Sequence, residues 1–380
     1  MSVQVQPMLQ MVDLKGQYQK IKDEIDASIH ACLDSTAFIN GAQVKSFQKN
    51  LEAYLGVRHV IPCANGTDAL QIAMMALGLE VGDEVIVPAF TYVATAEVIA
   101  LLHLKPIMVD VDPDTFNITA DIIEGAITPR TKAIVPVHLF GQSCDMETIM
   151  AMAKKHNLYV IEDTAQAIGA DYTFSDGQKA KAGTIGHVGC TSFFPSKNLG
   201  CYGDGGAIMT NDDDLAAKIR MMANHGQSRQ YYHDTIGVNS RLDSIQAGIL
   251  DVKLRHLDEY SAARQAAAAY YDAAFSQIDG LVIPGRQHNS THVFHQYTLR
   301  VKDGQRNALR THLTEGGVSA MIYYPIPLYK QKAYGHYWSG GELAVTEELS
   351  EEVMSLPIHT ELSEDILAYI TQTVASFFEK

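Results

Sequence analysis

The first candidate for a catalytic residue in this sequence is Lys197, in the segment SFFPSKNLG. It follows the apolar run 190–194 and precedes glycines at positions 200, 203, 205 and 206. A lysine where a strand exits into a tight loop can point into a pocket. Desolvation there lowers the pKa of the amine and favours Schiff-base formation. The alternative is an ordinary solvated lysine, because most lysines are exposed.

Asp163 ends the segment LYVIED, residues 158–163. Ligands of open α/β sheets bind beyond the carboxyl ends of the strands, so a carboxylate at this position is placed to face a ligand. Glu162 should point to the opposite face, because side chains alternate along a strand. A helix cap or a structural salt bridge is the alternative for Asp163. His138 also follows a predicted strand, and we expect it to be buried and hydrogen-bonded.

The segment ANGTDAL, residues 64–70, joins a short strand at 59–63 to an apolar helix. The backbone N–H groups of Gly66, Thr67 and Asp68 at a helix N-terminus can form an anion site, to which the Thr67 hydroxyl adds a donor. Ordinary capping by Thr67 or Asp68 is the alternative. Tyr92 follows the strand 84–88 by four residues, so its ring can stack on a planar ligand or pack in the core.

These four features together match the requirements of one cofactor, pyridoxal phosphate. It needs an amine, a carboxylate for its pyridine nitrogen, a cradle for its phosphate and an apolar face for its ring. A dinucleotide site is not favoured, because GCYGDGG lacks the GxGxxG spacing and no predicted helix follows it. There is no HExxH motif and no close His/Cys cluster, so we expect no metal site.

Alternating strands and helices must position these residues. Short apolar β-branched runs alternate with helical patterns between residues 64 and 210, which predicts a mostly parallel sheet covered on both faces. The predicted strands are 84–88, 106–111, 132–137 and 158–163, followed without long helices by 189–194 and 206–209. The predicted helices are 68–77, 95–103, 120–127 and 146–156, and a later one ends near residue 224.

The C-terminal part has a different character. A long helix is predicted at 242–269, followed by strands at 296–301 and 318–323 and helices at 305–315 and 364–378. This order predicts a smaller α+β domain at residues 260–380. Residues 1–259 would then form the large cofactor domain, including an N-terminal arm.

Composition excludes several classes of protein. The chain has 380 residues, of which 47% are hydrophobic and 19% charged, which is typical of a large buried core rather than disorder. Its net charge of −15 argues against nucleic acid as a partner. No signal peptide and no apolar run long enough to span a membrane is visible. Five cysteines without export indicate a reducing cytoplasm.

The chain resembles the sugar-nucleotide aminotransferases of the DegT/DnrJ/EryC1/StrS family, which have the fold type I pyridoxal-phosphate architecture. The resemblance runs from residue 64 to about 329. It rests on ANGTDAL, GDEVIVPAFTYVATAEVI, VPVHLFGQ, VIEDTAQAIGA, TSFFPSKNLG, GDGGAI, NSRLDSIQAGIL and YYPIPLY. Within the family, the stretch GTIGHVGCTSFFPSKNLGCYGDGGAI is most similar to enzymes that aminate C-3 of a UDP-linked 3-keto-N-acetylglucosaminuronate.

The resemblance implies a role for each site residue. Lys197 would form the internal aldimine with pyridoxal phosphate and move the α-proton, and Asp163 would hold the pyridine nitrogen protonated. Gln166 would contact the phenolic oxygen of the cofactor, and Tyr92 would stack on its ring. The remaining implied roles are phosphate binding by Gly66, Thr67, Asp68 and Ser192, phosphate binding across a homodimer by Asn239, and sugar-substrate binding by Arg241, Tyr323 and Tyr324.

The implied reaction is a two-step transamination in the synthesis of bacterial surface polysaccharide (lipopolysaccharide, O-antigen). Glutamate would leave as 2-oxoglutarate, with pyridoxamine phosphate as the intermediate form, and the keto sugar would then receive the amino group. Four alternatives stay open. They are an aminotransferase for another keto sugar (4-keto-6-deoxy or dTDP-3-keto hexose), a sugar 3-dehydratase, an amino-acid enzyme of the same fold, and a non-catalytic regulatory homologue. The dehydratases carry histidine in place of Lys197, which argues against that alternative.

Overall fold

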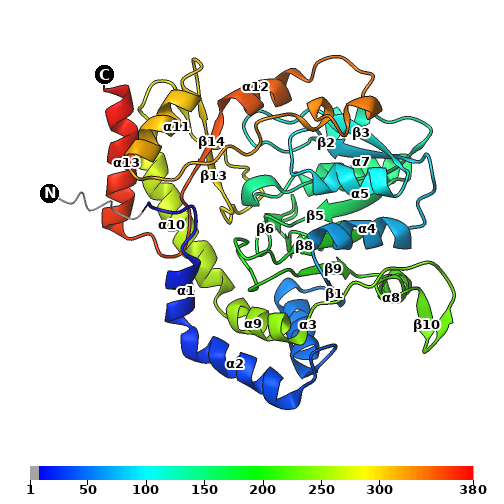
Figure 1. The fold of residues 1–380 in the computed structure, drawn as a ribbon. Coiled ribbons are helices and arrows are strands. Elements are labelled where there is room, and N and C mark those ends of the chain that lie inside the picture. Colours follow the sequence, from blue (N-terminus) through cyan, green and yellow to red (C-terminus); the bar gives the residue numbers. More distant parts are fainter. Residues whose placement is uncertain (1–7, 380) are drawn as a thin grey trace.

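A seven-stranded sheet organises the computed structural model, which describes residues 8–379 (Figure 1). The strands lie in the order β1-β9-β8-β5-β4-β2-β3. Their bounds are β1 His59–Cys63, β2 Glu84–Pro88, β3 Lys105–Val109, β4 Thr131–Ile134, β5 Tyr159–Asp163, β8 Val188–Ser192 and β9 Gly206–Thr210. The first seven residues, which belong to the N-terminal segment where no signal peptide is expected, lie outside the described residues.

The sheet is mostly parallel, as predicted. Strand β2 pairs in parallel with β3 and β4, β4 with β5, and β5 with β8. Only β9 is reversed, since it runs antiparallel to both β1 and β8. No helix separates β8 from β9, and a parallel pair needs a long crossover connection. The loop that carries Lys197 is therefore a direct return between two adjacent antiparallel strands.

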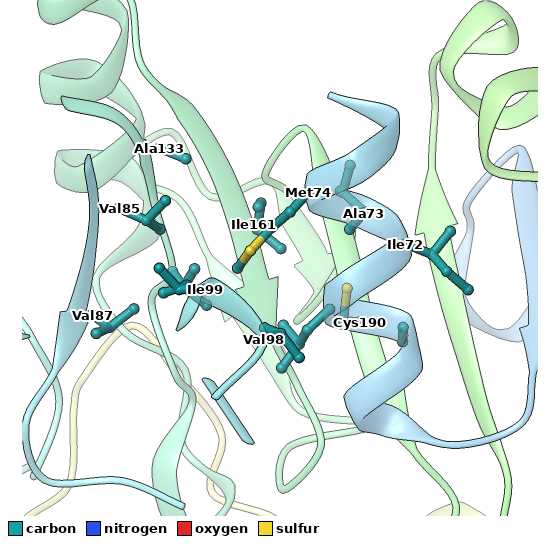
Figure 2. Packing of buried hydrophobic residues seen from close by; sticks show 14 of the residues in the cluster. Ile72, Ala73, Met74, Val85, Val87, Val98, Ile99, Ala133, Ile161 and Cys190 are labelled. Atoms are coloured by element: carbon teal, nitrogen blue, oxygen red, sulfur yellow. The ribbon is translucent and has the colours of Figure 1, made fainter. Parts of the chain in front are cut away.

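Helices cover both faces of the sheet because its strands alternate their apolar side chains between the two. Val85, Val87 and Ile161 pack against α4 and α5 on one face (Figure 2). The intervening residues Ile86 and Val160 pack against α6 and α7 on the other. Each buried valine or isoleucine contributes about 1.5–3 kcal/mol to stability. The helix bounds are α4 Gly66–Ala76, α5 Ala94–Leu101, α6 Ala120–Glu124, α7 Met146–His156 and α8 Asp213–Met222.

The segment predicted as one helix at 242–269 is two helices, so that prediction was wrong. Helix α9 spans Ser244–Leu254 and α10 spans Leu257–Phe275, with a tight turn between them in which His256 N–H bonds to the Lys253 carbonyl. Because of this break, the two helices pack against different partners. Helix α9 packs on the N-terminal helices, whereas α10 packs on α13, Glu364–Phe378. The N-terminal helices are α1 Leu14–Lys20, α2 Lys22–Ser35 and α3 Ala42–Leu55.

A second, three-stranded sheet lies in the C-terminal part, beside α10, α11 and α13 (Figure 1). It contains β12 Leu281–Val282, β13 Tyr297–Val301 and β14 Val353–Leu356; α11 spans Arg306–Glu315 and α12 spans Ala344–Glu352. The predicted strand 318–323 is wrong, because it forms only isolated bridges at Val318 and Met321. The predicted domain boundary at 259/260 lies within the continuous helix α10, and the division into two domains stays a prediction.

Short elements complete the described chain. Two hairpins are formed by β6 Asp171–Thr173 with β7 Lys179–Lys181, and by β10 Gln227–Arg229 with β11 Tyr232–His233. Three 3-10 turns span Leu139–Gly141, Leu328–Lys330 and Gly335–Tyr337. Within residues 8–379, none of the helices has the length and apolar character needed to cross a membrane. The same residues contain no group of three potential metal ligands.

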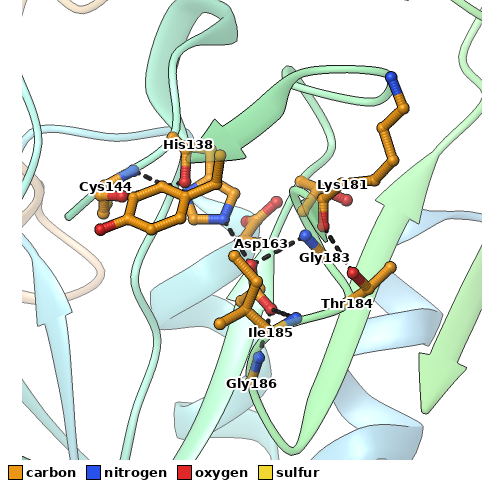
Figure 3. A network of polar contacts seen from close by, with 12 residues as sticks. His138, Cys144, Asp163, Lys181, Gly183, Thr184, Ile185 and Gly186 are labelled. Carbon is orange, nitrogen blue, oxygen red and sulfur yellow. Dashed lines mark hydrogen bonds and ion pairs between the residues drawn. The ribbon is translucent and has the colours of Figure 1, made fainter. Parts of the chain in front are cut away.

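The buried carboxylate of Glu162 connects the end of β5 to its surroundings. Figure 3 shows its partners His138, Gly183, Ile185 and Gly186. It accepts hydrogen bonds from the backbone N–H groups of Gly183, Ile185 and Gly186, at 2.8, 2.7 and 2.5 Å. His138 lies 2.9 Å away through Nε2. Because His138 Nδ1 accepts the N–H of Cys144, Nε2 carries the proton and donates it to Glu162. His138 is therefore buried and hydrogen-bonded, as expected, and Glu162 points away from the ligand edge.

Replacing this carboxylate should destabilise the centre of the sheet, where β5 lies. We expect Glu162→Gln to lower the free energy of unfolding by about 3 kcal/mol, because an amide cannot accept from all four donors in a buried site. Urea denaturation followed by circular dichroism measures the change. The control is Glu124→Gln, which removes a surface pair with Lys155 and should leave the midpoint unchanged. Equal midpoints for both variants would contradict the assigned role of Glu162.

Candidate active site

A cavity of about 720 Å³ opens where the parallel strands end. That volume suits a small-molecule ligand. Its wall combines the start of α4, the ends of β5 and β8, and the segments 91–94, 295–296 and 323–324. Ten of the twelve predicted site residues line it: Gly66, Thr67, Asp68, Tyr92, Asp163, Gln166, Ser192, Lys197, Tyr323 and Tyr324.

Lys197 lies on the cavity wall, in the return loop between β8 and β9. The loop is held tightly, since the backbone N–H of Lys197 donates to the Phe194 carbonyl at 2.8 Å. A Cβ at Gly200 would meet the Pro195 carbonyl oxygen at 2.4 Å, so only glycine fits there. The amine of Lys197 makes no hydrogen bond or ion pair with residues 8–379. Desolvation lowers its pKa to about 8, although the charge of Asp163 opposes the shift.

Asp163 is buried at the end of β5 and faces the same cavity. Its two oxygens accept from the Thr95 hydroxyl and from the N–H of Ala165, both at 3.1 Å. No cation forms an ion pair with it among the described residues. Burial raises the pKa of the carboxyl, while the Ala165 N–H and the charge of Lys197 oppose that shift. A cationic ligand atom here would relieve the cost of burying the charge.

The N-terminus of α4 forms one end of the cavity. Asn65 caps this helix, because its side chain accepts the N–H of Asp68 at 2.8 Å. The alternative of a cap by Thr67 or Asp68 is therefore wrong. The Asp68 N–H is also not available for an anion, which corrects the predicted set of donors. The N–H groups of Gly66 and Thr67 have no acceptor among residues 8–379. A Cβ at Gly66 would meet that of Ser192 at 2.7 Å, so these two residues form a close cradle.

The orientation of the Gln166 amide is determined by its neighbours. Its oxygen accepts the backbone N–H of Phe140 at 2.8 Å, so its NH₂ group lies on the other side. That group donates to the hydroxyl of Tyr324 at 3.3 Å. Gln166 therefore presents donors to the cavity, as contact with a phenolic oxygen requires. Tyr92 is 57% exposed beside the ring of Tyr324, so packing in the core does not explain it.

Asn239 and Arg241 do not line the cavity of their own chain. Asn239 is exposed and forms an isolated bridge with Asn224. Arg241 makes no ion pair with Asp243 or Asp251 among the described residues, although such a pair was the alternative to a ligand role. Their predicted function across a homodimer stays a prediction.

Several residues in or beside the cavity were not predicted from the sequence. Thr95 holds Asp163, and His295 and Gln296 reach the wall from a segment far along the chain. Thr95 sits within PAFTYVAT, but its spacing from Asp163 carries no periodic signal. The segment at 295–296 precedes β13 and contains no recognisable motif. Contacts of this kind depend on tertiary packing.

The cavity fits pyridoxal phosphate on its own geometry. It combines a buried carboxylate without an ion pair, an amine of lowered pKa, and a helix N-terminus with two free N–H groups. The close approach of Gly66 to Ser192 places the Ser192 hydroxyl beside the backbone donors at the start of α4, where an anion can bind. The residue types are therefore those that the cofactor needs.

Comparison with known proteins decides the family. Residues 19–375 match the DegT/DnrJ/EryC1/StrS aminotransferase family. The chain belongs to this family. It is 49% identical over 352 residues to the UDP-2-acetamido-2-deoxy-3-oxo-D-glucuronate aminotransferase of Pseudomonas aeruginosa, an alignment that covers 93% of this chain and 95% of that protein.

Solved structures show the same architecture. The crystal structure of DesV from S. venezuelae with a ketimine intermediate superposes with a TM-score of 0.94 at 37% identity, covering 99% of this chain and 100% of that one. NtdA from Bacillus subtilis, solved with bound cofactor PMP, gives 0.91 at 30% identity, with coverages of 100% and 87%. The predicted fold class and enzyme class are therefore confirmed, and use of pyridoxal or pyridoxamine phosphate is supported.

The lowered pKa of Lys197 predicts how cofactor capture depends on pH. Only the neutral amine attacks an aldehyde, and Lys197 is protonated below pH 8. Stopped-flow absorbance should show capture of pyridoxal phosphate by cofactor-free protein rising about tenfold per pH unit below that value and levelling above it. In Asp163→Asn the midpoint should fall, because the carboxylate charge that raises the pKa of the Lys197 amine in the wild type is removed. A rate independent of pH between roughly 6 and 9 contradicts this.

Proposed function

We propose that this protein transfers an amino group to the ketone of a nucleotide-linked sugar, at C-3 of UDP-2-acetamido-2-deoxy-3-keto-glucuronate, with glutamate as the donor. One observation carries the reaction type: a single cavity joins the amine of Lys197 to the buried carboxylate of Asp163, which forms no ion pair among the described residues. The choice of sugar rests on the 49% identity to the Pseudomonas aeruginosa enzyme.

The residues that would hold pyridoxal phosphate follow from the cavity. Lys197 would attach it covalently, Asp163 would face its pyridine nitrogen, and Gln166 would donate to its phenolic oxygen. Its phosphate would lie against the free N–H groups of Gly66 and Thr67, with the Ser192 hydroxyl beside them. When bound, the cofactor supplies an electron sink and a carrier for the amino group.

Lys197 would handle the protons in both half-reactions. Its amine, with a pKa of about 8, is neutral in a sufficient fraction near neutral pH to accept the α-proton of glutamate. In the second half-reaction the same nitrogen, now protonated, would return a proton to the sugar carbon that bears the new amine. Asp163 would remain ionised throughout, because a cation beside it offsets the cost of its burial.

The charge of the cavity supports a contribution from a second chain. Three carboxylates, Asp68, Asp163 and Asp204, line the cavity, whereas Lys197 is the one lysine or arginine among its lining residues. The proposed substrate carries a diphosphate and a uronate carboxylate, which these acids repel. Arg241 of a second copy would supply a planar donor pair for a carboxylate, and Asn239 would reach the phosphate cradle.

An aminotransferase for a different keto sugar is the main alternative, because the candidate sugars differ by few polar contacts. Mass spectrometry of reactions with a panel of UDP- and dTDP-linked keto sugars, each with glutamate, distinguishes them. We expect a mass change for one amino-for-oxygen exchange with the UDP-3-keto-uronate. Amination of another sugar alone would redirect the substrate assignment, and no amination of any would overturn the proposed function.

Asp163→Asn should separate cofactor binding from catalysis. An amide cannot stabilise a protonated pyridine nitrogen, so we expect the donor half-reaction to slow by at least about a hundredfold, while the cofactor stays bound through Lys197 and the phosphate cradle. Stopped-flow absorbance with glutamate measures the rate. Lys197→Ala, reconstituted in parallel, should lose the covalent absorbance band. A near-wild-type rate for Asp163→Asn would remove the assigned role.

The shared site predicts a homodimer as the active form. Sedimentation velocity combined with an activity assay should find activity only in the dimer. Mixing inactive Lys197→Ala with inactive Arg241→Ala should restore part of the activity, because a mixed dimer contains one intact site. A fully active monomer, or no restoration in proven mixed dimers, contradicts the contribution of Arg241 from a second chain.

A further inference from the structure

His295 lies in the cavity wall but takes no part in the roles assigned above. It is 6% exposed, and neither of its ring nitrogens makes a hydrogen bond with residues 8–379. Its Nδ1 atom is fully shielded. The ring therefore meets the cavity through its other atoms, which include Nε2.

Other buried histidines of this protein use their ring nitrogens internally. His138 uses both nitrogens, for Glu162 and for the N–H of Cys144. His292, three residues before His295, accepts the N–H of Phe294 through Nδ1 at 3.0 Å. Buried polar groups are nearly always hydrogen-bonded, because leaving one unpaired costs about 1–3 kcal/mol. The free imidazole of His295 in a ligand cavity thus points to a partner outside the chain.

The segment that carries His295 is held from three sides. Asn198, the residue after Lys197, donates to the Val293 carbonyl at 2.7 Å. The buried guanidinium of Arg264 donates to the carbonyls of Phe294 and Ile358, both at 2.9 Å. The N–H of Gln296 bonds to the Phe140 carbonyl at 3.2 Å. These contacts fix the imidazole relative to both Lys197 and Gln166, so it is presented rigidly to the cavity.

The surroundings of His295 keep its ring neutral. Burial lowers its pKa well below the ordinary value, and the positive charges of Lys197 and Arg264 lower it further. A neutral ring has one donor and one acceptor nitrogen. A buried acceptor without a partner is tolerated better than a buried N–H without one. The shielded Nδ1 is therefore assigned as the bare acceptor, which leaves the N–H at Nε2.

We propose that His295 is a further substrate-binding residue, which donates a hydrogen bond from Nε2 to an oxygen atom of the substrate beside Lys197. The inference rests on the proposed transamination and names one additional contact for it. A neutral donor polarises a carbonyl or binds a carboxylate without exchanging its proton. Two ligands can supply such an oxygen: the sugar, through its ketone or a neighbouring hydroxyl, and the amino donor, through its carboxylate.

The test compares His295→Leu and His295→Gln with a matched control, His292→Asn. Leucine removes the donor, whereas the glutamine amide can reach the position of Nε2. His292→Asn changes a histidine in the same segment but keeps an acceptor for the Phe294 N–H. Thermal unfolding and the cofactor absorbance of each variant are measured first. Each half-reaction is then followed in single turnovers, and calorimetry gives the affinity for 2-oxoglutarate and for the amino-sugar product.

We expect His295→Leu to lower the affinity for either 2-oxoglutarate or the amino-sugar product about tenfold and to slow the half-reaction that involves that ligand. Glutamine should restore part of the loss, and His292→Asn should resemble wild type. A loss in the glutamate half assigns the contact to the donor carboxylate, and a loss in the sugar half assigns it to a sugar oxygen. Unchanged affinities and rates in both halves would overturn the contact.

The outcome for His295 is separable from that for the proposed function. If wild-type protein binds no pyridoxal phosphate and aminates no sugar, the proposed function fails. If wild type is active and His295→Leu equals it, only this contact fails. If His295→Leu does not fold, His295→Ala takes its place, and wild-type affinities together with wild-type single-turnover rates in His295→Ala would overturn the donor role.

Discussion

The alternation of side chains along β5 is the constraint on which the rest of the site depends. Two adjacent carboxylates, Glu162 and Asp163, must point to opposite sides of the strand. Glu162 accepts from three backbone N–H groups and from His138, so its charge holds the segment 183–186 and His138 against the central strand β5. Asp163 receives only two donors and no ion pair from the described residues, so its remaining capacity is directed at the cavity. One strand thereby supplies both a structural anchor and a carboxylate that faces the cavity.

The loop between β8 and β9 is the second determinant of the site. Because β9 returns antiparallel to β8, no crossover helix is needed, and a glycine-rich loop at residues 193–205 carries Lys197 along the cavity. This loop has no space for a side chain at Gly200, and its tight packing fixes the position of Lys197. Asn198, the next residue, donates to the Val293 carbonyl and so holds the segment around Val293 against the same loop. The reactive amine and the C-terminal part of the wall are thus connected by one residue.

The charges in the cavity wall match the proposed ligands only in part. Burial lowers the pKa of Lys197 and raises that of Asp163, so the free site contains two groups whose charged forms are disfavoured. A ligand that brings a cationic ring nitrogen and an electrophilic carbon satisfies both. The excess of carboxylates in the wall, however, favours an additional cation from outside the chain. We regard this imbalance as the physical basis for expecting a shared active site.

The sequence by itself determined the central sheet, the order of its helices and most of the site. Apolar β-branched runs with helical patterns between them have few alternative folds, and residues that follow parallel strands must meet at one edge, as Lys197, Asp163 and Tyr92 do. Only the tertiary structure decided that Asn65 caps α4, that the chain bends between α9 and α10, and that His295 reaches the cavity. Those outcomes depend on contacts between segments far apart in the chain, whose energies leave no periodic trace in local sequence.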